Sequence, residues 1–309
     1  MPLWGFVISF ICATLWAASP IMADRGVALS RCTANEINPI RSFMFLILSF
    51  AAALVVGGGH IPLVTSPKAY AFIFGGVFVS YMFGDVFYFM SIRILGISIA
   101  VPVANAYPML VTLTSWLLLG EPITLTVFIG VTTVVAGLLF LRLGVPKSDT
   151  AAERSLMPKG KKLVKGFVLA IAAGCCWALG APMTKLSIVY SGLGAVDITF
   201  YRSVAFFILA WGSRYALQCM NPASTVPLRT LPRAGWIYMS ASGAIGLCIG
   251  SILYAACIEV MPVAIVTAIT ATSPFMAALF GHFVLKQKLF PLQWCGVIMI
   301  IAGSVVVSL

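Results

Sequence analysis

Long apolar runs separated by short polar stretches dominate this chain. Each run is about twenty residues long, the length that a helix needs to cross a hydrocarbon core of about 30 Å. Transmembrane strands would instead appear as shorter segments of alternating polarity. The pattern therefore predicts an all-α membrane protein with ten transmembrane helices. They are expected at residues 3–22, 38–57, 69–92, 98–119, 123–143, 166–189, 195–217, 235–257, 262–285 and 290–308.

Composition supports this prediction and limits the alternatives. The 309 residues are 61% hydrophobic and 9% charged, and the mean hydropathy is +1.07. Ten spans leave only short connections, so a separate soluble domain is not expected. The first apolar run has no Lys or Arg before it and is too long for a signal-peptide core, so we expect a retained span. We predict a multi-pass integral protein of the cell membrane.

The chain contains an internal repeat of five helices. An offset of 161 positions aligns Trp16 with Trp177, and an offset of 166 aligns Tyr88 with Tyr254. Because five is odd, the second copy must enter the membrane from the opposite side, the layout of many secondary transporters. We predict a first repeat at 1–143, a basic connecting loop at 144–165 and a second repeat at 166–309. Other aligned pairs are Gly5 and Gly166, Arg41 and Arg202, Gly84 and Gly250, Pro108 and Pro274, and Gly137 and Gly303.

The distribution of basic residues predicts the orientation. Of the 19 Lys and Arg residues, 16 fall in the odd-numbered connections and only Lys68, Lys185 and Arg202 fall in the even ones. Cytoplasmic loops carry the excess of positive charge, so the odd connections are expected in the cytoplasm and both termini outside. This topology also explains the net charge of +11 without nucleic acid, because no aromatic platform accompanies the basic residues.

Enzyme, metal and disulfide chemistry find little support in the sequence. The chain has no HExxH, GxSxG or GxxxxGK[ST] motif, so an enzyme is not expected. Two histidines make a multi-histidine metal site improbable, and His282 is expected to pack rather than to relay protons. The eight cysteines form no CxxC pair and mostly fall in apolar runs, so we predict no disulfide, metal or other cofactor.

Asp85 is the most informative polar residue, because a carboxylate within a span is costly and usually faces a cavity, a partner or a proton path. A structural pair with Arg93 is the alternative. Lys185 could attract an anionic group or extend to the membrane interface. Asn105, Tyr107 and Thr270 lie near two matched prolines and are candidate substrate contacts, although a threonine can also bond to its own helix. Further candidates are aromatic: Trp16, Tyr88, Trp177 and Tyr254 could form the walls of a binding site or a belt at the membrane interface.

Two stripes of small residues occupy matching places in the third and eighth predicted spans. They are Gly76, Ser80 and Gly84 in the first copy and Ser242, Gly246 and Gly250 in the second. Small residues at this spacing let helices approach closely. The stripes predict either helices that slide at a gate or static packing, and we favour packing.

Several short motifs together resemble the ten-helix EamA-type transporters of the drug/metabolite transporter superfamily. Trp177 followed by Lys185 is similar to a pair in the first helix of a family repeat, and Gly120-Glu121-Pro122 resembles the signature that closes the fourth helix. The pairs Ala136-Gly137 and Ala302-Gly303 fit the fifth and tenth helices. The chain departs from the pattern at Asp24, where the family has Lys, and at Lys286-Gln287, where it has Gly-Glu.

The resemblance implies a central cavity lined mainly by helices one to four and six to nine. It also implies export or exchange of small metabolites, including amino acids, and cytoplasmic termini, which conflicts with the charge count. We expect a secondary transporter with a small-molecule substrate in a lipid bilayer. Proton antiport is a hypothesis that rests on Asp85 alone. A flippase for a lipid-linked substrate and a membrane scaffold are the alternatives, and both a monomer and a homodimer fit the sequence.

Overall fold

The computed structural model describes residues 2–30, 34–95, 100, 103–143, 160–222, 226–276 and 290–308. Within these ranges the chain forms helices and connecting turns and no strand. Cys32, Pro102, His282, Lys286 and Gln287 lie outside the described residues. The helices of the first half are α1 (Leu3–Ser30), α2 (Ala34–Val56), α3 (Pro67–Val77), η1 (Phe78–Gly84), α4 (Asp85–Leu95), α6 (Tyr107–Leu119) and α7 (Leu125–Leu143). Those of the second half are α9 (Lys161–Ser191), α10 (Ala195–Met220), η3 (Leu228–Thr230), α11 (Arg233–Ser242), η4 (Gly243–Gly250), α12 (Ser251–Val260), α13 (Val263–Thr270) and α15 (Pro291–Ser308).

Among the described residues, six helical stretches are long and apolar enough to cross a membrane. Four shorter apolar helices fall at the fourth, fifth, ninth and tenth segments expected from the sequence. The long stretches are Leu3–Val27, Ile37–Val56, Pro67–Tyr88, Lys161–Ser191, Ala195–Met220 and Arg233–Val260. The shorter helices are Tyr107–Leu119, Leu125–Phe140, Val263–Met276 and Pro291–Val307.

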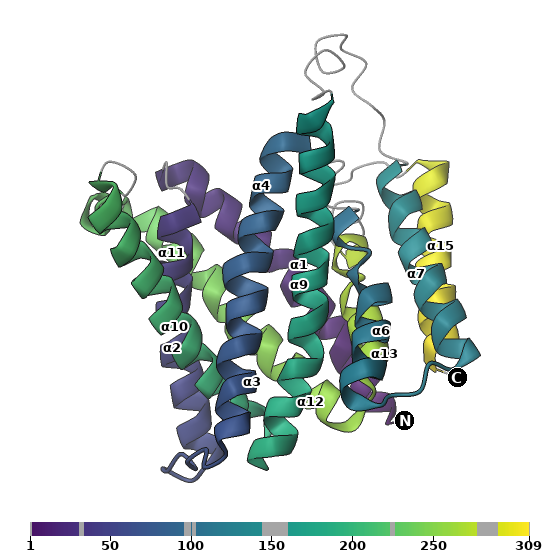
Figure 1. Ribbon diagram of the computed structural model, residues 1–309, viewed down its shortest axis with the longest axis horizontal. Coiled ribbons are helices and arrows are strands. Elements are labelled where there is room, and N and C mark those ends of the chain that lie inside the picture. Colours follow the sequence, from purple (N-terminus) through teal and green to yellow (C-terminus); the bar gives the residue numbers. More distant parts are fainter. Residues whose placement is uncertain are drawn as a thin grey trace. The chain divides into compact units, whose positions relative to one another are not determined.

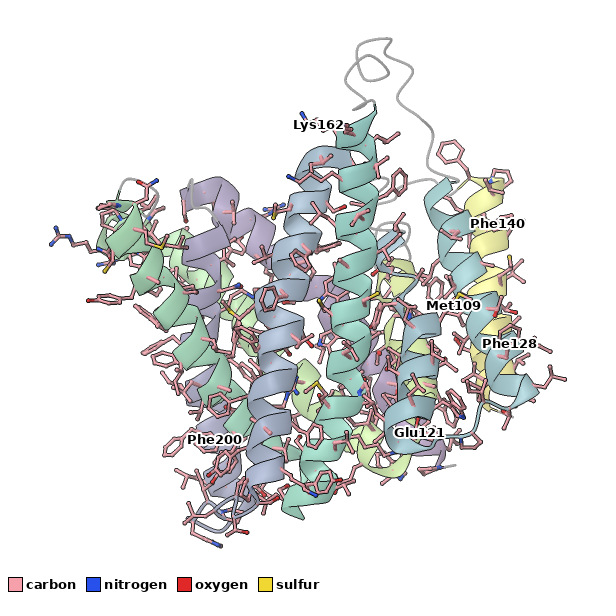
Figure 2. All side chains as sticks on the ribbon, viewed as in Figure 1. Met109, Glu121, Phe128, Phe140, Lys162 and Phe200 are labelled. Atoms are coloured by element: carbon pink, nitrogen blue, oxygen red, sulfur yellow. The ribbon has the colours of Figure 1, made fainter. Side chains whose placement is uncertain are left out.

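Large apolar side chains are exposed along many of these helices. Phe128 and Phe140 on α7 and Met109 on α6 are examples, and Figure 2 shows their side chains on the ribbon. Extended apolar exposure is rare on soluble monomers and marks a surface that contacts another apolar phase. Hydrocarbon lipid supplies that phase for the outer faces of membrane helices.

The described residues form two compact units. The first comprises Val79–Pro182 and Met261–Leu309, and the second comprises Pro2–Phe78 and Met183–Val260. In the first unit α7 packs along α15 and α6 packs on α13, and in the second α2 packs on α10 and α1 on α11, η4 and α12 (Figure 1). Each of these pairs joins a helix of the first half of the sequence to a helix of the second half. Neither half of the sequence is therefore a packing unit by itself.

Glycine allows the close contact between α7 and α15. A Cβ atom on Gly137 would lie 2.8 Å from the carbonyl oxygen of Gly296, and one on Gly303 would lie 2.7 Å from the backbone nitrogen of Val134. Both glycines belong to the Ala-Gly pairs that the sequence offers in its fifth and tenth apolar segments. Their role in this structure is to let two helix backbones touch.

Within the described ranges, two π-helical segments interrupt the stretches Pro67–Tyr88 and Arg233–Val260. These segments, η1 and η4, end at Gly84 and Gly250, which are 166 positions apart and match in the repeat. The small-residue stripes run into them, and Gly246 and Ser242 of the second stripe contact Ser19 of α1. Each extra residue of a π-helix widens the turn and shifts the residues that follow around the helix axis. The repeat therefore reproduces a local distortion as well as the helix order.

Candidate functional site

Asp85 begins α4, immediately after η1, and its side chain is half-buried. The indole Nε1 of Trp177, on α9, donates a hydrogen bond to Oδ1 of Asp85 at 3.1 Å. Gly84 makes room for this contact, because a Cβ atom there would lie 2.8 Å from both Cδ1 and Nε1 of Trp177. Any larger residue at position 84 would displace the indole that holds the carboxylate.

Two tyrosine rings surround the same indole. The ring of Tyr88, one turn after Asp85, lies 5.0 Å from that of Trp177 between centroids, and the ring of Tyr107 lies 5.8 Å away with its edge toward it. Asp85, Tyr88, Tyr107 and Trp177 all belong to the first unit, and we call them the Asp85 cluster. The structure thus brings together four of the nine residues that the sequence predicts for the site.

Contacts between α6 and α9 hold Trp177 in place. Thr114 donates from Oγ1 to the carbonyl oxygen of Ala178 at 2.7 Å, directly after Trp177 in the chain. Gly174, one turn before it, lies close to the carbonyl oxygen of Ala104 and to Cβ of Tyr107. The indole therefore projects from a stretch of α9 that is fixed on both sides.

The second unit repeats the contact between one tryptophan and one tyrosine, without the carboxylate. Trp16 lies 5.3 Å from Tyr254 between ring centroids, and Gly250 gives it room as Gly84 does for Trp177. Its Nε1 donates to the carbonyl oxygen of Gly246, within η4, at 3.1 Å. Ser251 occupies the position that matches Asp85. The two copies thus differ in the acceptor that the indole uses.

The structure places the remaining predicted residues as follows. Lys185 is half-buried on the part of α9 that belongs to the second unit. Asn105 is half-buried just before α6. Thr270 is fully buried and donates to the carbonyl oxygen of Val266 at 2.9 Å, which favours the bond to its own helix over a substrate contact. Of the basic residues at the starts of helices, Arg202 is buried and donates to Oγ1 of Thr184 at 2.6 Å, an anchor between α10 and α9.

Glu121 has a role that the sequence did not predict. Gly120 ends α6 in the left-handed conformation, with φ of 68°, and the carboxylate of Glu121 then accepts from the backbone nitrogen of Val263 at 2.9 and 3.0 Å. Val263 is the first residue of α13, where backbone N–H groups have no partner within the helix. Glu121 therefore caps α13 across 142 positions of sequence. Figure 2 shows it at the end of α6.

Two clefts lie elsewhere, and neither is lined by a predicted site residue. One, of about 180 Å³, lies in the first unit beside Glu121 and Thr112. The other, of about 380 Å³, is an open and mainly apolar groove between α2 and α11 in the second unit. Its lining residues are Met44, Leu48, Trp236, Ile237, Ser240, Ala241 and Ala244.

Comparison with known proteins gives a family and a fold. The model of the EamA-like transporter family matches residues 3–143 and 164–309. A protein of Archaeoglobus fulgidus named an uncharacterized transporter is 24% identical over 231 residues, which cover 75% of this chain and 73% of that protein. One solved crystal structure superposes with a TM-score of 0.75 at 16% identity and covers 99% of this chain and 98% of its own. At this identity the structural likeness shows the fold alone.

Proposed function

This chain belongs to the EamA-like transporter family, and we propose that it is a secondary transporter of small metabolites that works by alternating access. The family and the apolar helices make it a multi-pass membrane transporter rather than an enzyme. The finer proposal is that ten helices form two inverted repeats of five. These repeats would rock about a central substrate site, as in other transporters built from inverted repeats.

One observation carries this proposal: the hydrogen bond between Trp177 and Asp85 joins the two family matches. Asp85 lies in the first match and Trp177 in the second. Inverted-repeat transporters bind their substrates where the repeats meet, and a carboxylate within an apolar span usually faces a cavity, a partner or a proton path. The Asp85 cluster is the best candidate for that position.

The other predicted residues complete the proposed site in different conformations of the cycle. Asn105 is two residues from Tyr107 and would offer a polar contact beside the cluster. Trp16, Tyr254 and Lys185 are proposed as contacts that the substrate meets when the repeats have moved. We propose amino acids or related polar and amphipathic compounds as substrates, and exchange with protons at Asp85 as the energy source.

A metabolite-wide comparison of efflux and uptake tests the proposal. Cells that express the wild-type chain should move a solute that cells expressing equal amounts of Asp85→Asn do not move. Folding of the variant would be checked by its elution from a sizing column. Proton coupling would be contradicted if collapse of the proton gradient leaves transport of that solute into vesicles unchanged. A wild-type chain that moves no solute would contradict the transporter itself.

The groove between α2 and α11 favours one second function, a flippase for a lipid-linked substrate. It is open, mainly apolar and lined by residues from two candidate spans, as an acyl chain would require. Ala244→Trp would fill the groove. This reading predicts that the substitution abolishes movement of a fluorescent lipid between leaflets, whereas a metabolite transporter would tolerate it.

A further inference from the structure

We propose that the groove between α2 and α11 holds one acyl chain of an anionic phospholipid, whose phosphate binds Arg229 and Arg233. The lipid is a bound partner that stays in one leaflet, so this inference goes beyond the transport of metabolites proposed above. It follows from the lining of the groove, from its extent along α11 and from the charges at one of its ends.

The groove follows one face of α11. Its lining residues on that helix, spaced three or four apart or adjacent, are Trp236, Ile237, Ser240, Ala241 and Ala244. Met44 and Leu48, one turn apart on α2, form the other wall. The volume of about 380 Å³ lies within the range of about 300–1,000 Å³ that is typical of ligand sites. A flexible hydrocarbon chain suits a groove with these side chains.

The groove extends over the depth of one leaflet. At about 1.5 Å per residue, the stretch from Arg233 to Ala244 covers roughly 16 Å, and half of a hydrocarbon core of about 30 Å is about 15 Å. Trp236 lies one turn after the start of the span Arg233–Val260, where tryptophan is typical of the head-group level. The groove therefore matches an acyl chain of one leaflet, and it is too short to carry a head group across the membrane.

Two arginines lie at the head-group end of the groove. Arg233 is the first residue of α11, three positions before Trp236 and on the same face of the helix. The indole Nε1 of Trp236 donates to the carbonyl oxygen of Leu228 at 3.2 Å, which ties η3, and with it Arg229, to this end of the groove. Both arginine side chains are exposed. The sequence has no Asp or Glu at positions 198–258, so these charges are not offset within their own segment of the chain.

The charges, rather than the groove, select the lipid. In a bilayer the tails of all lipids are as apolar as the groove, so an acyl chain gains packing there but no hydrophobic stabilisation. Guanidinium groups bind phosphate through paired hydrogen bonds, and each cation near an anionic membrane surface adds about a fivefold preference. Phosphatidylcholine offers its phosphate together with a cation that the arginines repel. The site is therefore expected to prefer a lipid whose head group carries a net negative charge.

The other copy of the repeat lacks this combination. At the offset of 166 positions, Phe74 matches Ser240 and Phe78 matches Ala244, so two phenyl rings occupy places where the groove has small side chains. Pro67 matches Arg233. Small residues along the helix face and a cation at its end thus occur together in the second copy alone, as expected for a site rather than for a general property of the repeat.

Lipid retention by the purified full-length protein tests this inference. The protein is equilibrated with equal amounts of dioleoyl phosphatidylglycerol and dioleoyl phosphatidylcholine, and bound lipids are counted by native mass spectrometry. We expect the wild type to retain phosphatidylglycerol about tenfold or more over phosphatidylcholine, and the double variant Arg229→Gln, Arg233→Gln to lower this ratio to about twofold or less. The double variant Ser240→Phe, Ala244→Phe copies the other repeat and should lower retention of both lipids.

Controls separate the site from general attraction of lipid and from folding. Lys162→Gln removes an exposed cation at the start of α9 and should leave the ratio unchanged. Ala241→Leu is a smaller filling of the groove and should also lower retention if the double phenylalanine variant elutes as an aggregate. An equal ratio in the wild type and the arginine variant, or full retention in a folded groove variant, would overturn the inference.

Movement of a fluorescent phosphatidylglycerol between leaflets distinguishes a resident lipid from a cargo. We expect vesicles that contain the wild type to move it no faster than vesicles that contain the folded groove variant. Faster movement by the wild type would make the groove a path across the membrane, which would overturn the resident lipid and favour the flippase.

Discussion

Trp177 and Trp16 are matching residues of the repeat that donate to different kinds of acceptor. Trp177 bonds to the carboxylate of Asp85 at 3.1 Å, and Trp16 bonds to the backbone carbonyl of Gly246 at the same distance. Both indoles lie against a glycine that ends a π-helical segment. The repeat has therefore kept its packing while its chemistry has diverged at position 85.

Replacing each indole with a phenyl ring should reveal this difference. Trp16→Phe loses a neutral bond between helices, worth about 0.6 kcal/mol on average and up to about 1.7 in membranes. Trp177→Phe loses a hydrogen bond to a carboxylate, and hydrogen bonds to charged acceptors are roughly twice as strong as those to neutral ones. The thermal midpoint in one detergent should fall further for Trp177→Phe. Equal midpoints for the two variants would argue that the Asp85 bond carries no additional strength.

A double-mutant cycle isolates the same bond. Asp85→Ala and Trp177→Phe together should cost less than the sum of the single changes, with a coupling of about 0.5–2 kcal/mol. The matched cycle pairs Trp177→Phe with Glu259→Gln, an exposed carboxylate without a role in the cluster. Those two effects should add within about 0.5 kcal/mol. Coupling of similar size in both cycles would contradict a specific Asp85–Trp177 interaction.

Gly84 and Gly250 should not tolerate alanine. A Cβ atom would lie 2.8 Å from the Trp177 ring in one case and 2.6 Å from the Trp16 ring in the other. Overpacking of this kind costs about 1–3 kcal/mol. Gly212→Ala is the control, because nothing lies within 4 Å of its Cβ position in α10 and alanine is the better helix former. Thermal midpoints should fall for the first two variants and stay level or rise for the third.

Hydrophobic patterning predicted where the helices lie but not how they are distorted. The aligned pairs Trp16 with Trp177 and Gly84 with Gly250 follow from residue identity alone, and in the structure each tryptophan lies against one of these glycines. The π-helices could not be predicted in this way. One extra residue in a turn leaves the apolar pattern almost unchanged, and packing decides where that residue is inserted. Thr270 shows a second limit: a threonine near a proline has the same sequence signal whether it faces a substrate or its own helix.

Glu121 shows how a motif can be visible while its role is hidden. Gly-Glu-Pro marks the end of a helix, but the group that the carboxylate caps is 142 positions away. No local pattern joins Glu121 to Val263, since the contact exists only after α6 and α13 pack together. The family resemblance therefore singles out Glu121 in the sequence, but the sequence does not indicate that its carboxylate caps α13.

Removal of the Glu121 side chain should loosen α13. Glu121→Ala leaves the N–H of Val263 without its acceptor, which costs about 1–3 kcal/mol for a group shielded from water. Hydrogen exchange at residues 263–270 should become faster in this variant. Glu121→Gln keeps one acceptor oxygen, so its exchange rate at these residues should lie between those of the wild type and Glu121→Ala. Unchanged exchange in Glu121→Ala would mean that α13 is held by its packing alone.

Thiol labelling of intact cells should decide the orientation that the charge count predicts. His60 is exposed in the connection between α2 and α3, and Lys162 is exposed at the start of α9 (Figure 2). Cys32 and the exposed cysteines of the described ranges, Cys175, Cys219 and Cys295, would first be replaced with serine. The excess of positive charge in the odd connections places His60 outside and Lys162 in the cytoplasm. An impermeant maleimide should therefore label His60→Cys in intact cells and Lys162→Cys only after permeabilisation. The reverse pattern would place both termini in the cytoplasm and show that the basic residues do not set the topology.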